Sequence, residues 1–137
     1  MGRLLIPTLL LLALVAATAG AAREWKIDDR GVLMVIAKAP VKTRTRKNPY
    51  EGQPDAVAAG EKLFRQHCAE CHGDDARGLG RAANLRSSFV QNATPGELAW
   101  LLRNGNLPAG MPPWAGIPEQ RRWQIIAYIK SLGTPAQ

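Results

Sequence analysis

Residues 67–72 read HCAECH, a stretch that holds both cysteines and both histidines of the 137-residue chain. The spacing Cys-x-x-Cys-His is typical of covalent attachment of a c-type haem. Two thiols at this spacing can add to the two vinyl groups on one edge of a porphyrin, and the neutral imidazole of the next residue is a good ligand for the iron. The stretch therefore predicts a haem tethered by Cys68 and Cys71 and ligated by His72.

Two other kinds of site use the same cysteine spacing. A thiol–disulfide enzyme normally places Cys-x-x-Cys after a strand in a βαβ unit, and no such pattern flanks this stretch. Zinc needs four ligands that close a fold, whereas the available ones are crowded into adjacent positions. Both alternatives are weaker than haem attachment, and they depend on His67, Cys68, Cys71 and His72.

The N-terminus has the features of a secretory signal peptide. Arg3 precedes an apolar run at residues 4–16, and small residues come after it. Cleavage after Ala19 or Ala21 satisfies the small-x-small rule, so residues 1–21 are assigned to the signal. Export suits a paired-cysteine motif, because oxidised thiols persist outside the cytoplasm. We therefore expect a periplasmic protein.

An uncleaved membrane anchor is the alternative for the same segment. Residues 4–22 approach the roughly 20 apolar residues that a membrane span requires. Pro7, Thr18 and Gly20 weaken this interpretation. We expect contact with a membrane only if the segment is retained.

The size and charge of the chain limit how its core can form and which partners it can bind. A single domain of this length buries little core of its own, and a covalently bound apolar ring would supply much of it. The chain has 18 Lys and Arg against 11 Asp and Glu, a formal net charge of +7. Export argues against nucleic acid as the partner for this charge.

Residues 22–53 differ in composition from residues 54–137 and are assigned to an N-terminal extension and basic linker. Residues 25–28 and 32–36 are β-prone runs, and residues 29–31 between them suit a hairpin turn. We expect a small non-helical extension. The basic run at 38–47 is a candidate docking segment for an acidic partner or for membrane headgroups.

Residues 54–137 form the predicted main domain, in which helical signals dominate. Asp55 is a candidate N-cap, Thr94 and Glu97 form a capping box, and Gly133 is a helix stop. Prolines and glycines exclude regular structure between the last two helices. The expected helices are residues 56–68, 95–104 and 118–132, and the expected irregular segments are 73–86 and 106–117.

Two sequence patterns resemble the class I cytochromes c. One is G-x-x-x-F-x-x-x-C-x-x-C-H at residues 60–72, and the other is IIAYI at residues 125–129. The resemblance covers about residues 55–132 and implies an all-α fold, with a few helices around one covalently bound haem c. It also implies that the helix containing Gly60 crosses the one containing Tyr128, which explains a glycine that costs about 1 kcal/mol in a helix interior.

Elimination reduces the number of residues that could be the second axial ligand of the iron. His67 lies on the tethered segment and cannot reach the opposite face of the ring, and Met1 leaves with the signal. Met34 and Met111 remain. The resemblance favours Met111, because the proline-rich segment 108–114 lies where class I cytochromes present their methionine.

The family also has a proline before an Asn-Leu pair, whose carbonyl accepts a hydrogen bond from the ligating histidine. In this chain Ala83 precedes that pair. An alanine carbonyl can accept the same bond and orient the imidazole. The resemblance further implies that Phe64, Trp114 and Tyr128 pack around the haem.

The predicted function is single-electron transfer outside the cytoplasm. Iron ligated by both His72 and Met111 has no vacant position for a substrate, so we expect an electron carrier with no catalytic residues. Expected partners are redox proteins such as a dehydrogenase, an oxidase or another cytochrome, met through an apolar rim at residues 109–117. The alternatives are a dedicated haem subunit of a dehydrogenase or terminal oxidase and, less favoured, a haem-based sensor or peroxidase-like enzyme.

Overall fold

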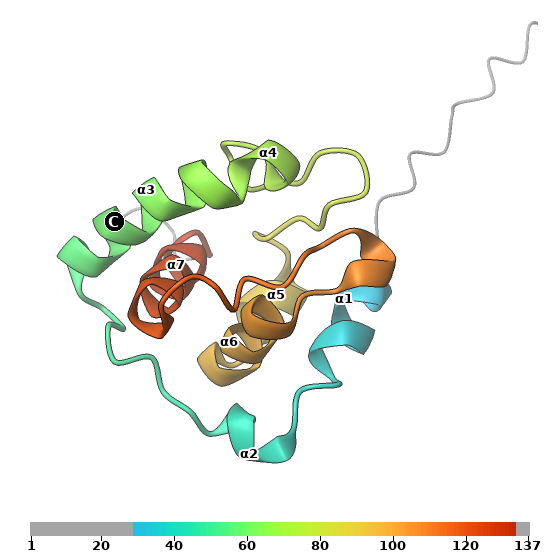
Figure 1. Cartoon of the computed structure of the whole chain (residues 1–137), viewed down its shortest axis with the longest axis horizontal. Helices are drawn as coiled ribbons and strands as arrows, with labels where there is room; N and C mark the ends of the chain where they lie inside the picture. The colour runs from blue at the N-terminus through green and yellow to red at the C-terminus, as the bar shows by residue number, and fades with distance from the viewer. Residues whose placement is uncertain (1–28, 134–137) are drawn as a thin grey trace, which may run out of the picture.

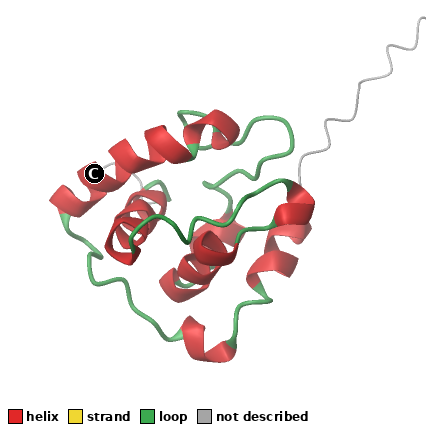
Figure 2. Ribbon diagram, viewed as in Figure 1, coloured by secondary structure: helices red, strands yellow, loops and turns green. Residues whose placement is uncertain are grey.

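The computed structural model describes residues 29–133, and all regular elements in that range are helical (Figures 1 and 2). The signal segment and the β-prone run at 25–28 lie outside the described residues. The all-α prediction is confirmed. The elements are α1 Asp29–Ile36, α2 Val41–Arg44, α3 Pro54–His67, α4 Ala69–His72, α5 Ser88–Asn92, α6 Pro95–Asn104, the 3₁₀ turn η1 Leu107–Ala109 and α7 Glu119–Ser131.

Among the described residues, α3 and α7 form the most extensive helix–helix contact (Figure 1). A Cβ atom added at Gly60 would overlap the backbone carbonyl of Gln124, so the two helices approach as closely as a glycine permits. One turn further along α3, the Phe64 ring lies 5.2 Å from the Tyr128 ring, in a tilted arrangement. The predicted close crossing is confirmed.

The N-termini of α6 and α3 are stabilised in different ways. The capping box of α6 is present as predicted: the backbone N–H of Glu97 donates to Thr94 Oγ1 at 3.2 Å, and Glu97 Oε2 accepts from the N–H of Thr94 at 2.8 Å. The prediction that Asp55 caps α3 was wrong. Gln53 is the N-cap and Pro54 opens the helix, which leaves Asp55 in the first turn, where its charge favours the helix dipole.

The N-terminal extension is helical, which corrects the predicted hairpin and the non-helical extension. Asp29–Ile36 forms α1, so residues 29–31 make a helical turn. Val32 and Ile36 are one turn apart and 8% and 4% exposed, whereas Met34 is 67% exposed. The buried pair packs against α5 and α6, and this burial outweighs the β propensity of the valine- and isoleucine-rich run.

The predicted irregular segment 73–86 is irregular in the structure. The predicted irregular segment 106–117 differs in one respect, because it contains the 3₁₀ turn η1, and the short helix α5 was not predicted. Within residues 29–133 no helix combines the length and apolar character needed to cross a bilayer.

Candidate functional site

A cavity of about 440 Å³ opens beside the hexapeptide HCAECH at residues 67–72 and is lined mainly by apolar atoms. Segments far apart in the sequence meet there: α1, the α3–α4 junction, the loop before α5, α6, and the turn after α6. The four predicted haem-binding residues all line it, namely Cys68, Cys71, His72 and Met111. A large apolar cavity bordered by two thiols and an imidazole fits a covalently attached haem.

The two cysteines lie where α3 passes into α4. The backbone N–H of His72 donates to the carbonyl of Cys68 at 2.9 Å, and this turn brings the cysteines to one end of the cavity. Both thiols are free; Cys71 is exposed and Cys68 is buried. Burial, reinforced by the neighbouring Cys71, raises the pKa of the Cys68 thiol to about 11. A protonated, buried thiol is a poor nucleophile in disulfide exchange, which weighs against the thiol-enzyme alternative.

The imidazole of His72 is held in one orientation. Its Nδ1–H donates to the carbonyl oxygen of Ala83 at 2.9 Å, the bond expected from the resemblance. A carbonyl can only accept, so the proton is on Nδ1 and Nε2 keeps its lone pair. Burial lowers the pKa of His72, partly offset by this hydrogen bond. The neutral ring that results is the form that binds iron.

Met111 is fixed by a small backbone loop. The N–H of Asn106 donates to the carbonyl of Met111 at 2.8 Å, and the N–H of Met111 donates back to Asn106 at 3.1 Å, around the turn η1. Gly110 closes this loop in the left-handed conformation, with φ +87°. The other candidate, Met34, is exposed and does not line the cavity. Of the two methionines, the structure brings Met111 together with His72.

Arg122 supports the segment after Met111, a role that the sequence reasoning missed. Its side chain is buried, and Nη1 donates to the carbonyls of Ala115, at 3.1 Å, and Ile117. A buried guanidinium needs such acceptors, because an unpaired polar group costs free energy in the interior. No sequence pattern distinguishes Arg122 from the other arginines of the chain.

Of the three aromatic residues predicted to pack around the haem, one lines the cavity and two lie at the α3–α7 crossing. Trp114 lines the cavity as predicted, with its ring 5.7 Å from the ring of His67. Phe64 and Tyr128 pack against each other at the α3–α7 crossing and do not line the cavity. Their closeness in the family pattern reflects the helix crossing.

The fold and the cavity define a c-type cytochrome. Residues 55–129 match the family described as cytochrome c oxidase, cbb3-type, subunit III, and the chain belongs to this family. It therefore carries covalently bound haem c and acts in electron transfer with other redox proteins.

Relatives of different kinds share this domain. The chain is 34% identical over 105 residues to the cbb3-type oxidase subunit CcoP of Rubrivivax gelatinosus, covering 71% of this chain and 34% of CcoP. It is 30% identical over 135 residues to cytochrome c550 of Pseudomonas aeruginosa, covering 94% of this chain and 91% of that protein. The crystal structure of cytochrome cL from Methylophaga aminisulfidivorans aligns with a TM-score of 0.56 and 27% identity, over 64% of this chain and 59% of that one. The chain thus spans about a third of the oxidase subunit and most of the c550.

Proposed function

We propose that the chain is a single-haem electron carrier outside the cytoplasm, with Cys68 and Cys71 tethering the haem and His72 and Met111 as its axial ligands. The observation that carries this proposal is that all four side chains line one apolar cavity. Support for the histidine comes from Ala83, whose carbonyl accepts a hydrogen bond from Nδ1–H and leaves Nε2 as the ligand atom.

The haem supplies reversible one-electron chemistry, and the chain supplies its surroundings. The apolar wall excludes water, so the charge of the oxidised iron is disfavoured and the reduction potential rises. Two fixed ligands reduce the rearrangement that accompanies electron transfer. With His72 and Met111 both holding the iron, no position would be open to a substrate, and the protein would serve as an electron-transfer partner without catalysis of its own.

Replacing Met111 by alanine tests the ligand assignment. We expect loss of the weak long-wavelength absorption band that marks methionine–iron bonding in oxidised cytochromes of this kind, together with a fall in reduction potential and a gain of cyanide binding. Met34→Ala is the matched control, because Met34 is exposed and should leave all three properties unchanged. Persistence of the band in Met111→Ala would contradict the assignment.

The free-carrier form is favoured by the similarity to cytochrome c550. The related cytochrome c550 is matched over 91% of its length, so the cytochrome domain and its extension make up most of that protein. The match to the oxidase subunit family supports the second candidate, a haem subunit bound to an oxidase. Fractionation of the native host distinguishes them: a carrier is released with the soluble periplasmic proteins, and a subunit co-purifies with a larger complex.

The domain limits and location are also proposals. We propose that residues 1–21 are removed on export, that 22–53 precede the matched domain as an extension, and that 54–137 form the cytochrome domain. The mass of the mature haem protein tests the first point. A mass beginning at residue 20 or 22 supports cleavage, and a mass that includes residues 4–16 supports a retained anchor.

A further inference from the structure

Residues 29–53, named the N-terminal strap, precede the family-matched residues 55–129 but form part of the haem cavity. The strap begins with α1, whose Val32, Val35 and Ile36 line the cavity. Val32 and Ile36 belong to the same buried cluster as Leu98 and Leu102 of α6. The cavity wall therefore contains side chains that the matched domain does not supply.

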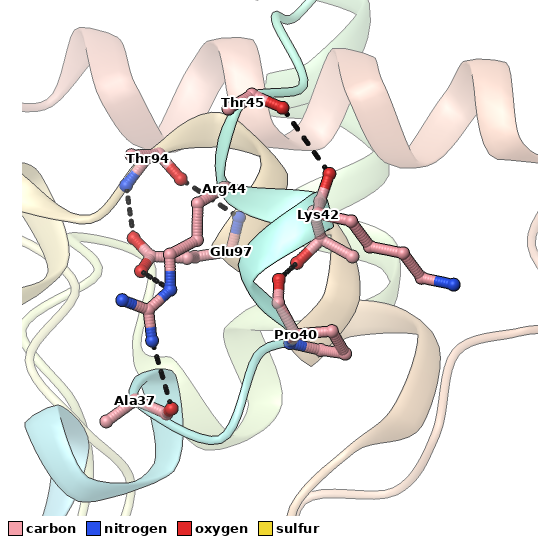
Figure 3. Close-up of polar contacts among 8 residues, drawn as sticks. Ala37, Pro40, Lys42, Arg44, Thr45, Thr94 and Glu97 are labelled. Carbon is pink, nitrogen blue, oxygen red and sulfur yellow. Dashed lines mark hydrogen bonds and ion pairs between the residues drawn. The ribbon is translucent and has the colours of Figure 1, made fainter.

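Arg44 fastens the strap at the end of α1 (Figure 3). Its Nε lies 3.3 Å from Glu97 Oε1, and its Nη2 donates to the carbonyl of Ala37 at 3.2 Å. The side chain of Glu97 is 12% exposed and also forms half of the α6 capping box with Thr94. A charge-assisted contact to a largely buried carboxylate is stronger than an ordinary surface ion pair. One arginine thus joins the end of α1 to the start of α6.

The remainder of the strap is also held closely. A Cβ atom at Gly96 would overlap the carbonyl oxygen of Thr43, so α2 lies directly against α6. Buried Asn48 donates to the carbonyl of Trp123 at 2.9 Å. Arg46 pairs with Glu119 and lies 5.1 Å from the centre of the Trp123 ring. These contacts occupy Arg44 and Arg46 of the basic run within the chain itself.

We propose that the strap is a working part of the electron-transfer site: Val32 and Ile36 shield the haem from water and raise its reduction potential, and Arg44 holds them in place through Glu97. This inference rests on the proposed function of the cavity as the haem site. The physical reason is that the apolar shell around a metal sets the local dielectric and the access of water. Truncating the shell favours the charged oxidised state and lowers the potential.

The test compares two faces of one helix in the full-length haem protein. Val32→Ala and Ile36→Ala shorten buried cavity residues, whereas Leu33→Ala and Met34→Ala remove similar side chains that are 48% and 67% exposed. Midpoint potentials are measured by spectroelectrochemical titration. We expect a lower potential for the first pair and the wild-type value for the second.

A second pair of variants tests the fastening without changing the core. Arg44→Ala should lower the potential in the same direction and speed the amide hydrogen exchange of α1, whereas the exposed neighbour Lys42→Ala should do neither. Arg44→Lys, which keeps the charge, should recover part of the loss. This comparison remains decisive if a cavity variant fails to fold.

The outcomes separate the strap from the haem assignment. If the wild-type protein lacks covalent haem or the methionine–iron band, the proposed function fails whatever the strap does. If wild type has both, and Ile36→Ala and Arg44→Ala keep the potentials of their controls, the strap inference is overturned and the proposed function stands.

Discussion

Replacement of both Cys68 and Cys71 by alanine is expected to abolish covalent haem attachment and most of the folded structure. The cavity beside these residues measures about 440 Å³. Without the ring, the apolar side chains that line this cavity face water and lose the packing of a filled core. The stability of a whole domain is about 5–15 kcal/mol, so a chain without haem has little stability left.

Two measurements check this result. Haem staining after denaturing gel electrophoresis should be lost in the double variant, and its far-ultraviolet circular dichroism should report much less helix than wild type. His67→Ala is the matched control, because His67 lies in the same hexapeptide and contacts Trp114 without supplying a thiol. A double variant that still retained haem through denaturation would show that attachment does not use these thiols.

Gly60→Ala is expected to destabilise the protein, although alanine is the better helix former. Propensity alone predicts a gain of about 1 kcal/mol. The added methyl group would overlap the carbonyl of Gln124 and approach Tyr128, so α3 and α7 must separate. Overpacking of this kind costs about 1–3 kcal/mol, and in this crossing it exceeds the gain. We expect a lower thermal midpoint for the haem protein.

The reverse substitution two positions earlier is the control. Ala58 is exposed on α3, so Ala58→Gly should cost only the propensity difference of about 1 kcal/mol. Opposite substitutions on one helix would then both destabilise, for different reasons. A Gly60→Ala protein more stable than wild type would contradict the close crossing.

Local signals predicted the parts of the fold that depend on few residues. The capping box at Thr94, the limits of α6 at residues 95–104 and the haem motif each depend on signals within a few positions, and the structure has them as expected. The crossing at Gly60 was expected only from the family resemblance. The neighbouring sequence does not indicate which backbone segment approaches a glycine.

The structure differs from the sequence-based predictions where contacts in the tertiary structure determine the local conformation or the role of a side chain. The run at residues 32–36 is β-prone in isolation, and it becomes helical because Val32 and Ile36 on one helical face both reach the core. Arg122 resembles the other arginines until the carbonyls after Met111 are placed around it. Likewise, Arg44 and Arg46 in the basic run find Glu97 and Glu119 far along the chain.

The position of α1 also affects where the N-terminal boundary of the folded domain should be drawn. The matched region starts at residue 55, but the core does not, because Val32 and Ile36 share it with Leu98 and Ile126. A fragment cut at the start of the matched region would keep every haem-binding residue and lose a side of its interior. The region that the family model matches is therefore smaller than the unit that packs, and an expression clone should begin before Asp29.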